Sequence, residues 1–108
     1  MPILAELNGE KLASVAAEIE AQGAECLAVE TDVGLPESVD AMVAKALDKF
    51  GKIDVLINNA ALFAVLSRKP FTEIPFEEWN KVLHVNITGS YLCARAVVPA
   101  MQEAGGGR

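Results

Sequence analysis

The segment Asp54-Val-Leu-Ile-Asn-Asn-Ala-Ala61 is the most informative part of this sequence. Residues Val55 to Ile57, together with Ile53, are apolar and rich in β-branched residues, which is typical of a strand buried on both faces of a parallel sheet. Two asparagines, Asn58 and Asn59, follow at once. In open parallel α/β sheets, ligands bind beyond the carboxyl ends of the strands. We therefore interpret the segment as a strand that ends at a binding site. The alternative is that the asparagines are ordinary turn residues that end a strand.

The residues before this segment predict two strand-helix units. A short strand at 3–5 is followed by a helix that Asn8 caps, and residues 25–29 form the next strand. A second helix begins at Pro36, which suits the first turn of a helix. Short units of this kind imply parallel pairing with right-handed crossovers, and hence an α/β fold in which residues 53–57 are the third strand.

The residues after the segment predict a loop and one long helix. Residues 60–75 show no period, and a loop of that length is usually functional or mobile. The helix spans 77–101, and its buried stripe consists of Trp79, Val82, Leu83, Asn86, Ser90, Cys93, Val97 and Met101. A buried asparagine must have its hydrogen bonds satisfied, so Asn86 either bonds the backbone of its own helix or faces a polar site.

Composition excludes several classes of protein. The chain has 108 residues, of which 52% are hydrophobic, so we expect one globular domain. Its formal net charge of −6 argues against nucleic acid and anionic membranes as partners. No segment has the length of a membrane span or of a signal peptide, and Cys26 and Cys93 have no metal-binding spacing with His84, the only histidine. We expect a cytoplasmic protein with reduced cysteines and no metal site.

Three motifs, in this order and at these separations, resemble those of the short-chain dehydrogenase/reductase family: Asp32-Val33, Asn58-Asn-Ala-Ala61 and His84-Val-Asn86-Ile-Thr-Gly89. The resemblance implies an NAD(P)-dependent oxidoreductase that transfers a hydride between a nicotinamide cofactor and a ketone or alcohol. It also implies a doubly wound, parallel, Rossmann-like sheet. The long helix is similar to that of the family's 3-oxoacyl reductases and alcohol dehydrogenases.

The resemblance covers nearly the whole chain but matches only the middle of a family member, from its second strand to its fourth helix. Residues 1–108 are therefore expected to form a single incomplete NAD(P)-binding domain with the order β-α-β-α-β-α. The first strand and the C-terminal strands of the family fold are not expected in it.

The resemblance also implies roles for individual residues. The implied cofactor-binding residues are Glu6, Asp32, Val33, Asn58, Asn59 and Ala60. Glu6 matches the acidic residue that binds the adenosine ribose, and it would repel a 2′-phosphate, so NAD is expected rather than NADP. Asn86 matches the asparagine of the family's catalytic tetrad, which holds a water molecule in the proton relay.

Several features of the family are not found in this sequence. There is no glycine-rich turn, and the family's serine and its Tyr-x-x-x-Lys pair are absent, so we expect the chain alone to be inactive. Ala61 replaces a glycine, which disfavours a positive φ there. Tyr91 and Arg95 lie four residues apart, but on the helix of Asn86, and we interpret Tyr91 as a solvent-facing or interface residue. His84 is expected to face a different side of the helix from Asn86.

Three functions remain open at this point. The first is a part of an oxidoreductase acting on a small carbonyl or alcohol substrate, and we prefer it. The second is a non-enzymatic interaction module built on the 77–101 helix, which in the family forms subunit interfaces and predicts a homo-oligomer. The third is an unrelated α/β binding domain, such as a flavodoxin-like one.

The resemblance has a consequence for the sheet itself. In the strand order 3-2-1-4-5-6, the first strand lies between the second and the fourth, which here are residues 3–5 and 53–57. Without it, these segments lie about twice the usual 4.8 Å apart. We expect a gap in the sheet, or a direct pairing of the two segments. We also expect the isolated chain to be insoluble, molten, or paired with a second copy.

Overall fold

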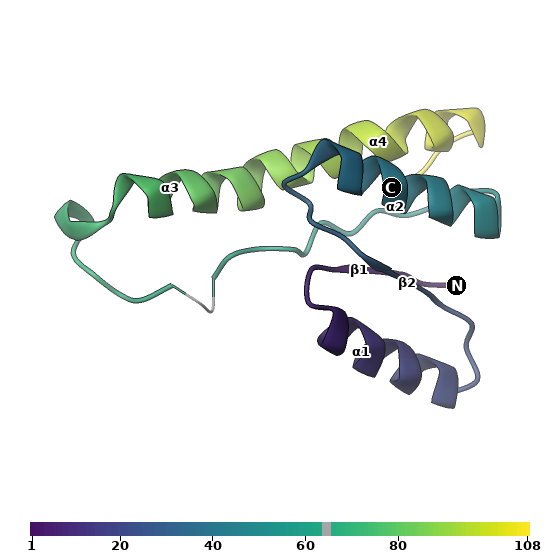
Figure 1. The fold of residues 1–108 in the computed structure, drawn as a ribbon. Helices are drawn as coiled ribbons and strands as arrows, with labels where there is room; N and C mark the ends of the chain where they lie inside the picture. The colour runs from purple at the N-terminus through teal and green to yellow at the C-terminus, as the bar shows by residue number, and fades with distance from the viewer. Residues whose placement is uncertain (64–65) are drawn as a thin grey trace.

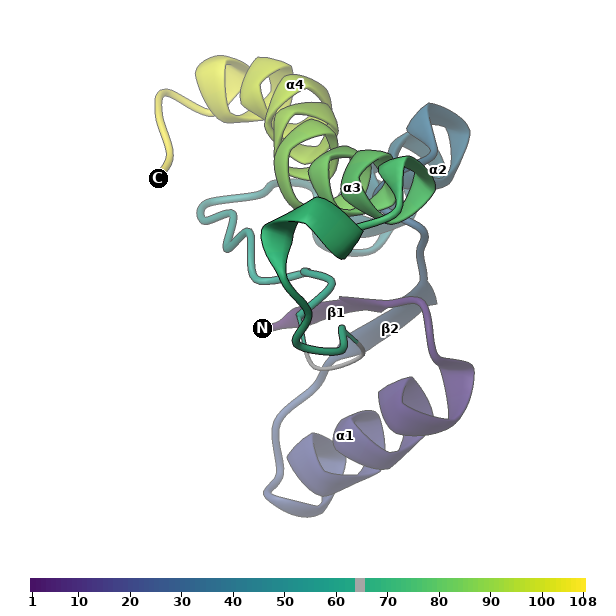
Figure 2. The ribbon, with the colours of Figure 1, turned by 90° about the vertical axis from the view of Figure 1, so that its left-hand side faces the viewer.

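The computed structural model describes residues 1–63 and 66–108, which form three layers (Figures 1 and 2). The middle layer is a parallel pair of strands, β1 (Ile3–Glu6) and β2 (Leu27–Glu30). Helix α1 (Gly9–Ala21) covers one face of this pair. Helices α2 (Pro36–Phe50) and α4 (Gly89–Glu103) lie on the other. The α/β class and the parallel pairing predicted from the sequence are confirmed.

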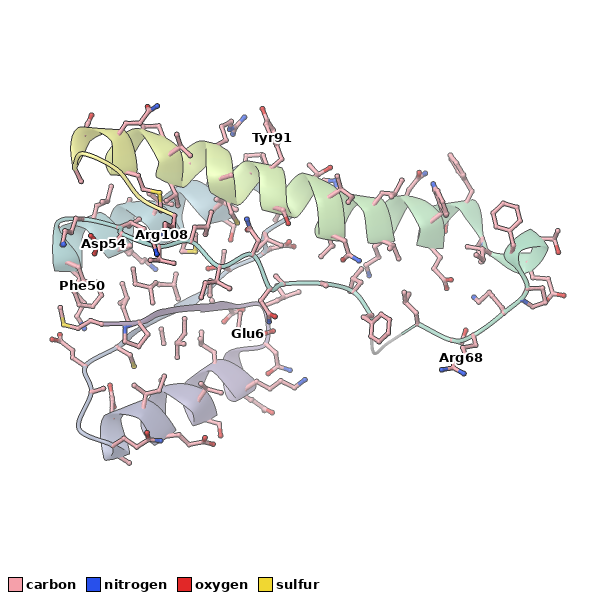
Figure 3. All side chains as sticks on the ribbon, turned by 180° about the vertical axis from the view of Figure 1, so that it is seen from behind. Glu6, Phe50, Asp54, Arg68, Tyr91 and Arg108 are labelled. Carbon is pink, nitrogen blue, oxygen red and sulfur yellow. The ribbon has the colours of Figure 1, made fainter. Side chains whose placement is uncertain are left out.

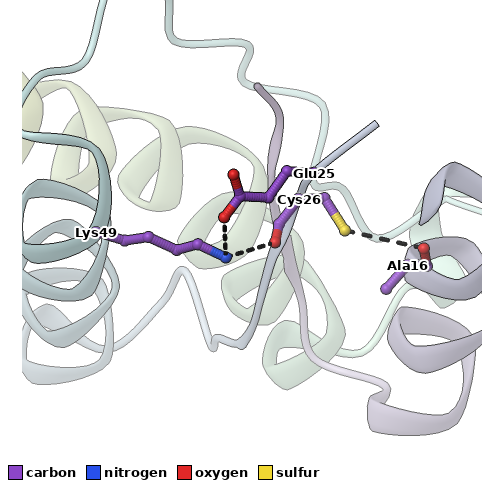
Figure 4. Close-up of polar contacts among 4 residues, drawn as sticks. All are labelled: Ala16, Glu25, Cys26 and Lys49. Carbon is purple, nitrogen blue, oxygen red and sulfur yellow. Dashed lines mark hydrogen bonds and ion pairs between the residues drawn. The ribbon is translucent and has the colours of Figure 1, made fainter. Parts of the chain in front are cut away.

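The first unit forms as predicted, except for the start of β2. The side chain of Asn8 caps α1 by accepting a hydrogen bond from the N–H of Lys11 at 3.0 Å. Strand β2 begins at Leu27 instead of residue 25. The carbonyl of Cys26 accepts a hydrogen bond from Lys49 Nζ at 3.0 Å, and the same ammonium lies 3.1 Å from Glu25 Oε1 (Figure 4). These contacts tie the approach to β2 to helix α2 before the ladder begins.

Helix α2 and helix α4 form the main core with one face of the sheet. Pro36 is the first residue of α2, and Gly51 ends the helix with a left-handed φ of 74°. Val39 in α2 and Val97 in α4 are fully buried between these layers. The core consists of Val29, Val39, Met42, Val43, Ala46, Ile53, Leu92, Cys93, Val97 and Met101.

Residues 53–57 were predicted to be the third strand, and this prediction is wrong for the described part of the chain, whose sheet has two strands. One side of the segment does pair with the C-terminal residue (Figure 3). Arg108 donates its N–H to the carbonyl of Asp54 at 3.1 Å, and Leu56 donates to the carbonyl of Arg108 at 2.8 Å. This is the bonding pattern of a parallel ladder, one residue long. On its other side the segment faces a cavity rather than β1. The expected gap is present, and the direct pairing with β1 does not occur.

The long helix predicted at 77–101 is present as three consecutive pieces. Helix α3 (Phe76–Leu83) passes into a π-helical turn, η2 (His84–Thr88), and then into α4. A short 3₁₀ turn, η1 (Phe71–Glu73), precedes it within the predicted loop. Trp79 and Leu83 were expected to be buried, but 47% and 42% of their surfaces are exposed. The reason is that α3 extends past the end of the sheet (Figure 1).

Candidate functional site

The carboxyl ends of the parallel segments lie at one edge of the molecule. Strand β1 pairs with β2 in a register that places Glu6 opposite Glu30. Residues 53–57 run in the same direction as both strands (Figure 1). Glu6 therefore lies at the same edge as the turn that follows β2 and as Asn58, which follows the 53–57 segment. This is the edge at which open α/β sheets bind ligands.

A cavity of about 870 Å³ connects this edge with the gap between β1 and residues 53–57. Five of the seven predicted site residues line it, namely Glu6, Val33, Asn58, Asn59 and Ala60. Asp32 and Asn86 are not among the residues that line the cavity. The wall along the gap is largely apolar, with residues such as Ile3, Leu12, Val43, Ala46 and Val97. The predicted cofactor residues Glu6, Asn58 and Asn59 add polar side chains to the cavity at the carboxyl edge.

Glu6 is exposed, and its carboxylate is held by the chain itself. Its Oε1 atom accepts a hydrogen bond from the N–H of Asn8 at 2.9 Å. Because Asn8 also caps α1, the end of β1 and the start of α1 form one braced turn. One carboxylate oxygen is engaged in this way, and the other has no hydrogen bond among the described residues.

Asp32 organises the turn after β2. Its Oδ1 atom accepts from the N–H of Gly34 at 2.8 Å, and its own N–H donates to Ser38 Oγ at 2.9 Å. The carbonyl of Asp32 accepts from the N–H of Leu35 at 3.1 Å. The side chain of Val33 packs against helix α4 at Gly89, where an added Cβ would lie 2.8 Å from Val33 Cγ2.

Asn86 lies in the π-helical turn and bonds the backbone of Leu62. Its Oδ1 accepts from the N–H of Leu62 at 2.7 Å, and its Nδ2 donates to the carbonyl of Leu62 at 3.2 Å. The sequence suggested that the side chain of Asn86 either bonds the backbone of its own helix or faces a polar site. In the structure it bonds the backbone of a different segment. The side chain instead holds the segment that follows the Asn-Asn turn, a contact over 24 positions. The water-holding role that the resemblance implies for Asn86 stays a prediction.

His84 faces a different segment from Asn86, as expected, and that segment is the turn that contains Asp32 and Val33, two of the predicted cofactor-binding residues. Its Nε2 atom lies 2.8 Å from the carbonyl oxygen of Gly34, in the turn after β2. Sequence reasoning missed this contact because Gly34 gave no signal of its own. The helical turn at 84–88 thus contacts two segments, Leu62 through Asn86 and Gly34 through His84.

Tyr91 points away from the sheet (Figure 3), and 59% of its surface is exposed. The guanidinium of Arg95 lies 5.8 Å from the centre of its ring. This is a surface cation–π pair. The geometry agrees with a solvent-facing or interface tyrosine.

Both cysteines are free and buried, and burial raises the pKa of the Cys93 thiol. Across residues 1–63 and 66–108, no three His, Cys, Asp or Glu side chains are grouped as metal ligands. Within the same residues, no helix is long and apolar enough to cross a membrane.

Comparison with known proteins identifies the family. Residues 2–108 match the protein family described as short chain dehydrogenase. An uncharacterized oxidoreductase of Thermotoga maritima is 39% identical over 105 residues, which are 97% of this chain and 40% of that protein. A 3-oxoacyl-[acyl-carrier-protein] reductase of Synechocystis is 38% identical over 95 residues, which are 88% of this chain and 37% of that protein. The chain thus spans about 40% of the length of such relatives.

Solved structures show the same similarity in three dimensions. A short-chain type dehydrogenase/reductase from Mycobacterium marinum superimposes with a TM-score of 0.87 at 30% identity, over 95% of this chain and 39% of that one. A 7α-hydroxysteroid dehydrogenase in complex with NADH and 7-oxo glycochenodeoxycholic acid gives a TM-score of 0.87 at 27% identity, over 97% of this chain and 40% of that one. Because the family match extends over residues 2–108, this chain belongs to the short-chain dehydrogenase/reductase family.

Proposed function

We propose that this chain is the part of an NAD(P)-dependent oxidoreductase that binds the adenosine half of the cofactor and carries the asparagine of the active site. The observation that carries the proposal is the shared cavity, because Glu6, Val33 and the 58–60 turn come from separate segments and line one space. The relative with bound NADH supports a nicotinamide cofactor. The substrate class that we propose is a small ketone or alcohol.

The residues at the carboxyl edge fit an adenosine group. Glu6 has one carboxylate oxygen braced by Asn8, which leaves the other to accept hydrogen bonds from ribose hydroxyls. The half-buried side chain of Val33 lines the cavity and offers an apolar surface to an adenine. We propose that Asp32, which lies beside the cavity and accepts from the N–H of Gly34, contacts the adenine from the same turn. When bound, the cofactor supplies the hydride. NAD is proposed over NADP, because Glu6 would repel a 2′-phosphate.

We propose two roles for Asn86. Its side chain positions the residues after the Asn-Asn turn through Leu62. Its place in the π-helical turn suits the water-holding role that the family resemblance implies. Because residues 1–108 contain no Tyr-x-x-x-Lys pair to donate the proton, we propose that the chain alone does not catalyse turnover of a ketone or alcohol.

The test separates binding from turnover. A soluble protein that contains residues 1–108 is titrated with NAD, and the isolated chain is assayed for NADH oxidation with ketones against a boiled control. We expect saturable NAD binding that Asp32→Ala weakens, and no turnover by the isolated chain. Turnover that Tyr91→Phe abolishes would show that Tyr91 is the proton donor. A lack of NAD binding in every such protein would refute the cofactor site.

A second role is supported by apolar side chains that the long helix leaves exposed. They follow one another along α3, η2 and α4, with exposed fractions of 47% for Trp79, 42% for Leu83, 64% for Ile87, 59% for Tyr91 and 43% for Val98. Such a stripe marks an interaction surface. We propose that it joins two copies of the protein, and that a purely structural interaction module is the alternative function.

Sedimentation of the wild-type protein and of Ile87→Glu tests the proposed interface. We expect the wild type to be an oligomer and Ile87→Glu to be smaller, whereas Glu10→Gln on the exposed side of α1 serves as the control. An oligomer that Ile87→Glu leaves intact would place the interface elsewhere.

The free cysteines support the reducing cytoplasm as the compartment in which the protein acts.

A further inference from the structure

We propose that His84 is a positioning residue, whose imidazole holds the turn after β2 at a set place against the helix that carries Asn86. The inference rests on the function proposed above, because that function assigns the adenine to Asp32 and Val33 in this turn. The proposed role of His84 is to fix the distance between the turn of Asp32 and Val33 and the helical turn of Asn86.

The contact between His84 and the turn is close and directional. Nε2 lies 2.8 Å from the carbonyl oxygen of Gly34, 50 positions away in the sequence. Because a carbonyl oxygen only accepts, Nε2 must carry the proton and donate it. A Cβ added to Gly34 would lie 2.9 Å from both Cδ2 and Nε2 of the ring, so the imidazole packs directly on the glycine.

The turn transmits this contact to the site because it is braced internally. The carboxylate of Asp32 accepts from the N–H of Gly34, and the carbonyl of Asp32 accepts from Leu35. Ser38 Oγ in addition accepts from the N–H of Asp32. A displacement of the Gly34 carbonyl therefore moves the carboxylate of Asp32 with it.

A second contact lies on the other side of Asn86 along the helix. Val33 packs into the space left by Gly89, five residues after His84. This apolar contact sets the spacing between turn and helix, and the hydrogen bond of His84 sets the orientation of the turn. Asn86 lies between the two and binds Leu62. One helical segment thus holds both segments that leave the carboxyl edge of the sheet.

Two substitutions separate the hydrogen bond from the bulk of the ring. His84→Phe keeps a flat ring but removes the donor, whereas His84→Gln keeps an N–H donor at similar reach. Both are placed in a soluble protein that contains residues 1–108. The readouts are the dissociation constant for NAD and the rate of amide hydrogen exchange in residues 31–35. Asn80→Ala, at an exposed position on α3, is the control.

We expect His84→Phe to raise the dissociation constant for NAD about threefold to tenfold, which is the range that the net contribution of one hydrogen bond gives. Exchange in residues 31–35 should become faster, exchange in α1 should not change, and His84→Gln should recover most of both effects. If His84→Phe does not fold, His84→Asn replaces it, because its shorter amide does not reach Gly34.

The inference is overturned if the variant without the donor leaves both NAD affinity and exchange at the wild-type values, or if His84→Gln restores neither. Failure of the proposed function has a different signature. In that case the wild-type protein itself does not bind NAD, while the exchange rates still show whether His84 holds the turn.

Discussion

The carboxamide of Asn86 and the backbone of Leu62 form a reciprocal pair, with the N–H of Leu62 donating to Oδ1 at 2.7 Å and Nδ2 donating to the carbonyl of Leu62 at 3.2 Å. The pair joins the π-helical turn to the segment that leaves the carboxyl edge of the sheet. An asparagine suits this position because it offers one donor and one acceptor side by side, as a backbone does.

Asn86→Ala should therefore lower stability as well as activity. Both backbone groups of Leu62 would lose their partner. Leaving a buried polar group unpaired costs about 1–3 kcal/mol, and these groups are partly buried, so we expect a cost at the lower end of that range. In an active protein that contains this chain, we expect kcat to fall more than the affinity for the cofactor, because the proposed role lies in proton transfer. Steady-state kinetics and denaturant unfolding measure the two effects.

Asn86→Asp provides the matched comparison. Aspartate keeps an acceptor for the N–H of Leu62 but brings a charge toward the carbonyl of Leu62. We therefore expect a free energy of unfolding lower than that of the wild type and higher than that of Asn86→Ala. An Asn86→Ala protein with wild-type kcat would remove Asn86 from the catalytic site.

Gly89→Ala should destabilise the protein, although alanine usually stabilises a helix interior by about 1 kcal/mol relative to glycine. The added Cβ would lie 2.8 Å from Val33 Cγ2, 3.3 Å from its Cβ and 3.4 Å from its carbonyl oxygen. Overpacking of this kind costs about 1–3 kcal/mol. In a soluble protein that contains residues 1–108, we expect a lower free energy of unfolding in urea, with no change in the slope against denaturant.

The double variant Val33→Ala/Gly89→Ala tests the cause. If the clash is responsible, the double variant should be more stable than the sum of the two single changes predicts, because Val33→Ala removes the methyl group that the new Cβ would meet. Strict additivity would mean that Gly89 is needed for another reason.

The cofactor preference should follow from Glu6. Its exposed carboxylate would accept hydrogen bonds from the 2′- and 3′-hydroxyls of NAD, whereas the 2′-phosphate of NADP would meet a like charge. We expect a higher kcat/KM with NAD than with NADP in an active protein that contains this chain. Glu6→Ala should narrow the difference in kcat/KM between the two cofactors, chiefly by lowering the value for NAD. A preference for NADP that Glu6→Ala leaves unaltered would refute this assignment.

The parts of the fold that local chemistry determines could be predicted from the sequence. The cap at Asn8, the start of α2 at Pro36 and its end at Gly51 each depend on residues close in the chain. Whether residues 53–57 form a strand could not be predicted in this way, because a strand needs partners. That segment has the right side chains, but among the residues that the structure describes only Arg108 pairs with it. Hydrophobic pattern gives the propensity of a segment, whereas the ladder depends on the rest of the sheet.

The site shows the same division. Glu6, Val33 and the 58–60 turn line one cavity, because the carboxyl ends of parallel segments share an edge. Their roles toward a cofactor stay a prediction. The partners of Asn86 and His84 could not be predicted. Both are backbone groups, of Leu62 and Gly34, which every residue type possesses. The π-helical turn that presents both side chains also has no sequence signal of its own.

The gap beside β1 leads to a prediction about the isolated chain. The carbonyls of Pro2 and Glu6 accept hydrogen bonds from β2, so by the alternation of a strand the backbone groups of Ile3 and Ala5 point into the gap. On the opposite side, Asp54 and Leu56 bond Arg108, which turns the backbone groups of Val55 toward the gap. Neither edge has a partner there within the described chain.

These edges are also apolar. In the 53–57 segment, Val55 is 57% exposed and Ile57 is 79% exposed. Unpaired edges with exposed apolar side chains pair readily with other chains. Where water does not reach these edges, each unpaired backbone group costs about 1–3 kcal/mol, and a domain is usually stable by only about 5–15 kcal/mol. We therefore expect the isolated chain to be insoluble, molten, or associated with a second copy, without a cooperative monomeric transition.

Sedimentation, thermal unfolding and amide NMR of the isolated chain test this prediction, with Val55→Lys as the control for pairing through the gap. A lysine at this edge should reduce association, because a charge there opposes the addition of a strand. It should not restore a cooperative transition, since the backbone groups remain unpaired. A wild-type monomer with a sharp thermal transition and dispersed amide signals would show that water satisfies the gap, and that residues 1–108 form an autonomous domain.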